Sequence, residues 1–158
     1  MESITSLSKK LKKAKFATPG GAAISLQQSD NFYWDPAANT VFYNPNAQNA
    51  SLFLLHELGH ALLGHGAYNT DIELIGMERA AWERAKQLCH QYGIAAQSDI
   101  VQDSLDTYRD WLHARSLCPH CGATGVQAGA QSYQCFNCNT TWRVNEARTC
   151  ALRRYKAA

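Results

Sequence analysis

The sequence lacks any uninterrupted apolar run approaching the roughly 18 residues that a membrane-spanning helix requires. Its first segment, MESITSLSKKLKKAKF, is basic but has no apolar core followed by a small-residue cleavage site, so it does not resemble a secretory signal. Internal repeats and low-complexity segments are also missing. These absences predict a globular, cytoplasmic protein with no membrane partner.

Net charge is low as well, at +2, but the charges are segregated along the chain. Residues 1–15 carry five lysines against one glutamate, and residues 116–158 carry five basic residues against one acidic residue. The segment between them holds five basic and eleven acidic residues. We interpret the two basic ends as solvated, with a surface for nucleic acid or an acidic partner as the alternative.

Cysteine occurs at only six of 158 positions, and the absence of a secretion signal favours metal binding over disulfides. The length allows one domain with its own core and a small appendage. After Ser116 the composition shifts to Cys, Gly, Thr, Asn and Gln. We therefore expect a basic N-terminal helix or tail over residues 1–15, a main domain over 16–115 and a small module over 116–158.

The main domain has the pattern of an α+β fold. Aromatic and β-branched residues surround the turn-rich segment DPAAN, which predicts strands with a hairpin. Three helices are expected after it, over about 51–64, 71–92 and 99–115. The strand around Thr40–Tyr43 is a candidate edge strand that could hold an extended peptide.

The segment LLHELGHALLGHG, residues 54–66, contains the HExxH pattern in His56, Glu57 and His60. On a helix the two histidines lie about 40° apart, so both imidazoles can reach one zinc ion. Glu57 lies close enough to act as general base on a metal-activated water without being a ligand. Buried core histidines are the alternative. We expect His65, half a turn from His56 on a continuing helix, to cap or support rather than to bind metal, unless Gly64 breaks the helix.

A catalytic zinc usually has three protein ligands and one open position, so a third ligand is needed. The next expected helix offers Glu73, Glu78 and Glu83. Glu78 lies at the centre of its apolar face, and the other two lie about 140° to either side. Because a carboxylate on a buried stripe needs a metal or a cation beside it, Glu78 is the candidate ligand. A salt bridge from Glu78 to an arginine of another element is the alternative.

These residues resemble a known family. HExxH followed by a glutamate in the pattern ExxAxxxA, here Glu78, Ala81 and Ala85, is similar to the ImmA/IrrE family of bacterial metallo-endopeptidases over roughly residues 30–92. The resemblance implies a small zincin-like α+β fold with the two HExxH histidines and Glu78 as zinc ligands and the HExxH glutamate as general base. It also implies that the substrate is a protein partner, often a repressor or regulator.

The sequence departs from that family at Trp82, where asparagine is usual, at Arg84, where phenylalanine is usual, and in having no evident helix-turn-helix segment. A SprT-like metallopeptidase is an alternative, since those enzymes also join HExxH to a C-terminal zinc ribbon. It would require a third histidine further along, and residues 70–80 contain none. In either family the mechanism is the same and needs a hydrogen-bond donor that stabilises the oxyanion, for which Tyr68 and Tyr108 are candidates.

The C-terminal module contains two CxxC pairs separated by 13 residues, and two such knuckles can close a tetrahedral site. Short alternating strands around GVQAG, SYQC and TWRV suit a zinc ribbon. An iron–sulfur cluster or two disulfides are the alternatives, and Cys89 and Cys150 lie outside the pattern. We expect two zinc ions per chain, one catalytic and one structural, the second held by Cys118, Cys121, Cys135 and Cys138.

The role of the ribbon is open at this point. Trp142 could stack on a base and the C-terminal tail is basic, so nucleic-acid binding and docking of a substrate are both considered. The predicted function is zinc-dependent cleavage of a protein partner. The alternatives are a non-catalytic DNA-binding or scaffold protein and a metal-dependent hydrolase of a non-peptide amide. The basic residues of the tail are Arg148, Arg153, Arg154 and Lys156.

Overall fold

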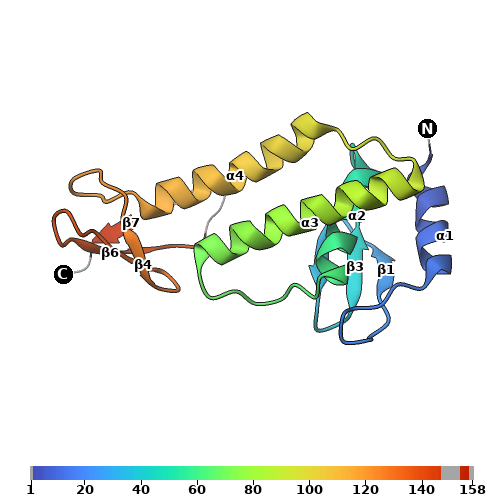
Figure 1. Cartoon of the computed structure of the whole chain (residues 1–158), viewed down its shortest axis with the longest axis horizontal. Coiled ribbons are helices and arrows are strands. Elements are labelled where there is room, and N and C mark those ends of the chain that lie inside the picture. The colour runs from blue at the N-terminus through green and yellow to red at the C-terminus, as the bar shows by residue number, and fades with distance from the viewer. Residues whose placement is uncertain (1, 147–153, 157–158) are drawn as a thin grey trace. The chain divides into compact units, whose positions relative to one another are not determined.

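The computed structural model describes residues 2–146 and 154–156, which run from α1 to β7 in Figure 1. They form two compact units: the first comprises the chain up to Ala67 together with Met77–Val101, and the second comprises Tyr68–Gly76 and the chain from Gln102 onward. Helices α3 (Asp71–Tyr92) and α4 (Ser98–Ser116) each contribute residues to both units. The domain boundaries expected at residues 15 and 115 stay predictions. Across the described residues, no helix is long and apolar enough to cross a membrane.

The first unit contains a three-stranded mixed sheet (Figure 1). Strands β2 (Tyr33–Asp35) and β3 (Thr40–Tyr43) form the expected antiparallel hairpin, and β1 (Ser25–Gln28) pairs in parallel with the other side of β3. The strand order is β1-β3-β2, so the expectation that Thr40–Tyr43 forms an edge strand is wrong. A local pattern does not reveal the parallel partner that covers the second side of β3. Strands β1 and β2 are the edges of this sheet.

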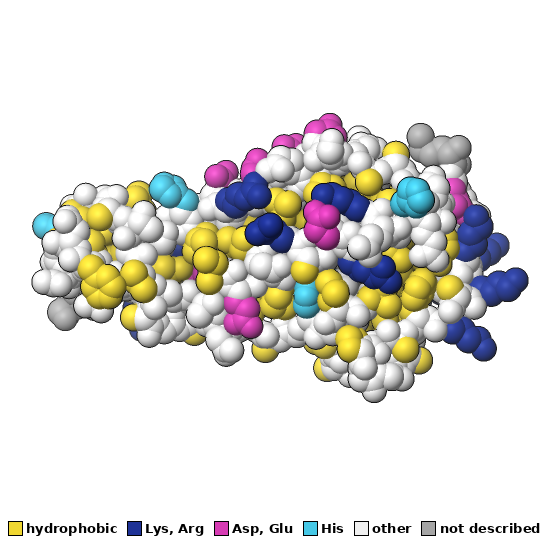
Figure 2. Space-filling view, in the orientation of Figure 1, with side chains coloured by type: hydrophobic (Ala, Val, Ile, Leu, Met, Phe, Trp, Pro, Cys, Tyr) yellow, Lys and Arg dark blue, Asp and Glu magenta, His cyan; other side chains and the backbone are white. Residues whose placement is uncertain are grey.

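Helix α1 (Ile4–Ala14) is amphipathic, and its basic character was predicted. Leu7 and Leu11, one turn apart, are buried, and the helix contacts α2 and β1. The Ser3 hydroxyl accepts a hydrogen bond from the Ser6 backbone N–H and so caps the N-terminus. A group of basic side chains covers α1 in Figure 2. The exposed lysines here are Lys9, Lys10, Lys12, Lys13 and Lys15.

Helix α2 (Ala50–Leu62) carries the HExxH pattern and packs against β3. It is apolar on most sides, and Leu54, Leu55 and Leu58 are fully buried. The helix ends earlier than expected because Gly64 adopts the left-handed conformation, with φ +67°. The His65 backbone N–H then bonds to the carbonyl of His60, which closes the helix as a Schellman turn.

Helices α2 and α3 approach each other closely at Gly59. A Cβ atom added there would lie 2.6 Å from the carbonyl oxygen of Ala81, so only glycine allows this contact. The facing side of α3 is apolar as predicted, since Ala81 and Ala85 are fully buried around the buried Glu78. Small residues on both helices therefore bring the HExxH motif and Glu78 together.

The second unit contains an antiparallel sheet in the order β4-β5-β6-β7. The three strands expected for the ribbon are confirmed as β4 (Val126–Gly129), β5 (Ser132–Gln134) and β6 (Thr141–Val144), and β7 (Arg154–Lys156) extends them. Trp142 is fully buried, stacks on Tyr133 and donates its indole N–H to the carbonyl of Arg115. The expectation that Trp142 stacks on a base is therefore wrong, because strand alternation places it on the core side.

A buried ion pair joins the two helix segments of the second unit. Arg115 Nε lies 2.7 Å from Asp71 Oδ2, and both side chains are 2 % exposed. The Tyr133 hydroxyl donates to the same oxygen at 2.6 Å. Burial, together with the hydrogen bond to Asp71, raises the pKa of Tyr133 above its usual range. The strands of the ribbon are thus tied to the first turn of α3 and the end of α4.

The fold class predicted from the sequence is confirmed. The chain is α+β, with a mixed sheet and helices that carry a His-x3-His pair and a glutamate, followed by an antiparallel sheet with four cysteines.

Candidate metal centres

Two groups of side chains in the described residues could hold a metal ion. The first consists of His56, His60 and Glu78, all buried, whose ligand atoms lie within 4.8 Å of one another. His56 Nε2 lies 3.2 Å from His60 Nε2 and 3.2 Å from Glu78 Oε2, and His60 Nε2 lies 3.4 Å from Glu78 Oε1. The structure therefore brings together the three residues that the sequence nominated.

These distances fit a tetrahedral zinc site. Metal–nitrogen and metal–oxygen bonds of about 2.0–2.1 Å place two ligand atoms of a tetrahedron roughly 3.3–3.4 Å apart. The two imidazole nitrogens lie at about that spacing from each other, and each lies at about that spacing from one of the two Glu78 oxygens. A tetrahedral ion held by three residues keeps a fourth position for water or substrate. Burial opposes the ionisation of Glu78, but its hydrogen bonds with His56 and His60 outweigh that and hold its pKa well below the usual range. The carboxylate form required of a ligand is thus favoured.

Glu57 lies next to the ligands without belonging to the group. Burial raises the pKa of Glu57 above its usual range; the neighbouring imidazoles of His56 and His60 partly offset the shift, and a backbone hydrogen bond from Trp34 adds a smaller offset. Trp34 lies on the edge strand β2, paired with Val41 of β3. The sheet therefore lies beside the carboxylate that the sequence assigned as base, a neighbour that no side-chain pattern could reveal.

Trp82 supports His56. The two rings stack with centroids 4.0 Å apart at an interplanar angle of 21°, and Phe53 meets Trp82 edge-on. His56 Nδ1 and Trp82 Nε1 are the buried side-chain nitrogen or oxygen atoms of the described residues without a hydrogen-bond partner. His56 is thus oriented by stacking. From the sequence, Trp82 was a departure from the family pattern that falls on the apolar face of the helix beside Glu78, but its contact with His56 was not predicted.

His65 contacts a ligand from the other side. Its Nδ1 lies 2.8 Å from His60 Nδ1, and it does not belong to the ligand group. Burial lowers the pKa of His65. Gly64 breaks the helix, as the sequence allowed, and the break brings His65 beside His60 rather than into the group of candidate ligands.

The other carboxylates of α3 lie away from the centre. Glu73 and Glu83 are exposed, as the helical periodicity predicted, and Glu83 pairs with Lys86 at 2.7 Å. Tyr68 and Tyr108, the candidate oxyanion donors, belong to the second unit. Their role stays a prediction.

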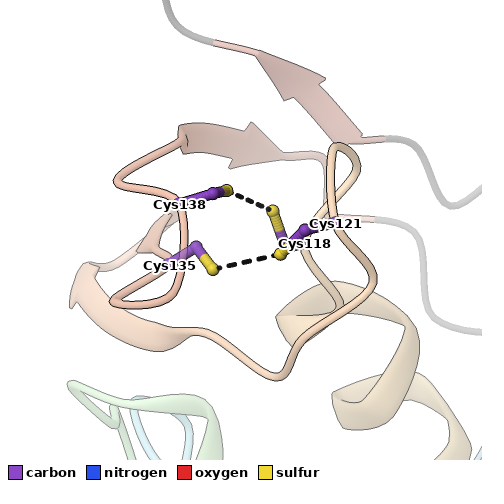
Figure 3. A group of neighbouring side chains, drawn as sticks. All are labelled: Cys118, Cys121, Cys135 and Cys138. Atoms are coloured by element: carbon purple, nitrogen blue, oxygen red, sulfur yellow. Dashed lines mark hydrogen bonds between the residues drawn. The ribbon is translucent and has the colours of Figure 1, made fainter.

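The second group is the four-cysteine cluster of the second unit, whose sulfurs point toward one another in Figure 3. Cys118 Sγ lies 3.7 Å from Cys138 Sγ, and Cys121 Sγ lies 3.6 Å from Cys135 Sγ. The edge of a zinc–thiolate tetrahedron is roughly 3.8 Å for bonds of about 2.3 Å. Disulfide-bonded sulfurs would be about 2.05 Å apart, so all four cysteines are free thiols arranged for one ion.

Hydrogen bonds to the sulfurs favour thiolates at part of this cluster. The Asn137 side-chain amide lies 3.5 Å from Cys121 Sγ, and with the Ala123 backbone N–H it lowers the pKa of Cys121 to about 6. For Cys118, backbone N–H groups of its CxxC turn outweigh burial and lower the pKa. At Cys135 two backbone N–H groups favour the thiolate, but burial and the neighbouring sulfurs raise the pKa to about 11. The cluster has the chemistry of a shared cation site.

Of the remaining predicted residues, Cys89 is buried in α3 away from both groups, and burial raises its pKa to about 11. Cys150, Arg148, Arg153 and the side chain of Lys156 lie outside the described residues. His120 is exposed, as expected. Arg154 is exposed and donates to the carbonyl of Leu117.

No protein-family model, curated protein or solved structure matches the chain.

Proposed function

We propose that the protein is a zinc-dependent endopeptidase that cleaves a protein partner, with a catalytic zinc at His56, His60 and Glu78. The observation that carries the proposal is the convergence of these three buried ligands beside Glu57, a carboxylate that is not one of them. A site that only stabilised the fold would need no such carboxylate. The ligand set is also the one implied by the resemblance to ImmA/IrrE metallo-endopeptidases, and Glu78 in the third place argues against a SprT-like arrangement.

Zinc bound at this centre would polarise a scissile carbonyl and activate a water molecule at its open position. Glu57 takes the proton from the attacking water and passes it to the leaving amine nitrogen. Glu78 and the two histidines would hold the ion, and the backbone of Trp34 lies beside the Glu57 carboxylate.

A pocket of about 340 Å³ in the first unit supports a peptide substrate. Its lining includes Trp34, which contacts the base, and His65, which contacts a ligand. Pro36 and the 40 % exposed Leu63 provide apolar walls, and none of the described residues that line the pocket is Asp, Glu, Lys or Arg. We propose that it receives an uncharged substrate side chain near the scissile bond.

For the four-cysteine cluster we propose a structural zinc, because four ligands leave no open position. Binding of nucleic acid or of the substrate by the ribbon stays a proposal, and Trp142 is not available for it because it is buried.

The test compares the wild type with Glu57→Gln and Glu78→Ala. Metal analysis should give two zinc ions per chain in the wild type and in Glu57→Gln, and one in Glu78→Ala. In cells, new protein termini should appear with the wild type and fall about 10²–10⁴-fold with Glu57→Gln, the usual range for loss of a general base.

Glu83→Gln is the matched control, because Glu83 is an exposed carboxylate of α3, the helix that carries Glu78. It should keep both metals and full activity. Identical terminus profiles for the wild type and Glu57→Gln would instead favour a non-catalytic scaffold, and salt-sensitive DNA binding would favour the nucleic-acid alternative.

A further inference from the structure

The turn after α2 places His65 where the helix alone would not. Gly64, with φ +67°, ends the helix, and the His65 backbone N–H bonds to the His60 carbonyl at 3.0 Å. A continuing helix would direct His65 to the side opposite His56. The turn instead sets the two imidazoles His60 and His65 with centroids 5.0 Å apart and an interplanar angle of 68°.

The contact between these imidazoles has a defined direction when His60 is a ligand. His60 Nε2 faces His56 and Glu78. A neutral imidazole that binds a metal through Nε2 carries its proton on Nδ1. His60 Nδ1 is therefore the donor, and His65 Nδ1, 2.8 Å away, is the acceptor.

His65 is itself held by the sheet. The Trp34 indole N–H donates to the backbone carbonyl of His65 at 2.8 Å. Trp34 pairs with Val41 of the central strand β3, and its backbone also bonds to Glu57. Trp34 therefore contacts both Glu57, the proposed base, and His65, the residue beside His60.

We propose that His65 is a positioning residue for the metal centre, which accepts the Nδ1 proton of His60 and so keeps His60 Nε2 directed at the ion. This inference deepens the proposed function and rests on it. It assigns different supports to the two histidine ligands: His56 is oriented by stacking on Trp82, and His60 by a hydrogen bond.

The test uses two near-isosteric substitutions in the full chain. In His65→Asn the amide oxygen can take the place of the Nδ1 acceptor, whereas His65→Leu has a side chain of similar shape without an acceptor. Zinc affinity is measured by competition with a chelator, and Co²⁺ is substituted to record the visible absorption of the triad site. Partners that orient ligands typically contribute 10–100-fold in metal affinity, so we expect such a loss with His65→Leu and near-wild-type affinity with His65→Asn.

Two controls distinguish a local effect of the His65 substitutions on His60 from general misfolding of the chain. The zinc of the cysteine cluster should be unchanged in both variants and serves as an internal reference. His90→Phe replaces an exposed histidine of α3 and should leave both affinities and the Co²⁺ spectrum unchanged.

Equal affinity of His65→Leu and wild type would overturn the inference while leaving the metal centre intact. Equally weak binding by His65→Asn and His65→Leu would overturn the acceptor role. A wild-type chain that binds only the cysteine-cluster zinc would overturn the proposed function itself, and with it this inference, and metal stoichiometry distinguishes that result from the other two.

Discussion

The two metal centres belong to units with very different cores. In the first unit the triad lies beside a core of fully buried leucines on α1 and α2. Among the described residues of the second unit, the buried cluster has five members, and two of them, Cys118 and Cys135, are themselves candidate ligands. The candidate ligands are therefore part of the buried core in the second unit, whereas the core of the first unit is formed by other side chains.

The two candidate sites also differ in their number of protein ligands. Four cysteines complete a tetrahedron, whereas His56, His60 and Glu78 leave one position open and have Glu57 beside them. A small core needs the free energy of metal binding to fold. A larger core can tolerate a site with only three protein ligands, and the proposed catalysis needs the fourth position to stay open.

Removing the cysteine-cluster metal should have the largest effect. Structural zinc contributes on the order of 10 kcal/mol to folding. Cys135→Ser should therefore lose one zinc ion, and strands β4, β5 and β6 should unfold. Amide NMR signals of the ribbon should collapse toward random-coil positions while those of the first unit stay dispersed. Cys89→Ala, which removes a buried thiol outside the cluster, should keep the ribbon signals. Dispersed ribbon signals in Cys135→Ser would show that the core of the second unit does not depend on its metal.

An intermediate effect is expected where the triad depends on close helix packing. In Gly59→Ala the new Cβ would lie 2.6 Å from the Ala81 carbonyl oxygen, so the helices must separate. We expect a loss of about 1–3 kcal/mol in the free energy of unfolding, with weaker zinc binding at the triad. Chemical denaturation and chelator competition measure the two quantities.

Gly76→Ala is the matched control for that substitution. A Cβ there meets no atom within 4 Å, and alanine favours a helix over glycine by about 1 kcal/mol. This variant should be slightly stabilised with unchanged zinc affinity. If Gly59→Ala behaved in the same way, close packing would not control the ligand spacing.

The smallest effect concerns pH. Burial and the hydrogen bond to Asp71 raise the pKa of Tyr133 in the folded state, so above about pH 10 the unfolded chain loses this proton first. The free energy of unfolding then falls as pH rises through that range. Tyr133→Phe should be less stable by about 1 kcal/mol near neutral pH, and the gap should narrow at high pH.

Urea unfolding followed by far-ultraviolet circular dichroism at about pH 8 and about pH 11 measures that gap. Tyr155→Phe, at a position 49 % exposed, should show no such narrowing. A gap that stayed constant for Tyr133→Phe would mean that the buried hydroxyl does not couple the second unit to pH.

Much of the first centre was predictable because helical periodicity is local. The HExxH spacing and the position of Glu78 on an apolar face identified the three candidate ligands of the first group, and the CxxC spacing identified the four cysteines of the second. The edge strand was misassigned because β1 reaches β3 by a parallel pairing. Trp142 was misassigned because an exposed and a buried aromatic look alike without the register of the sheet.

Residue type and spacing within one helix or one CxxC turn are enough to show which side chains can bind metal. The residues that support those side chains became visible only in the folded chain: Trp82 stacks on His56, His65 contacts His60, and the backbone of Trp34 lies beside Glu57. These contacts join segments through a left-handed turn, a sheet register and a close helix approach. Such features depend on how whole elements pack, so no single segment of the sequence contains them.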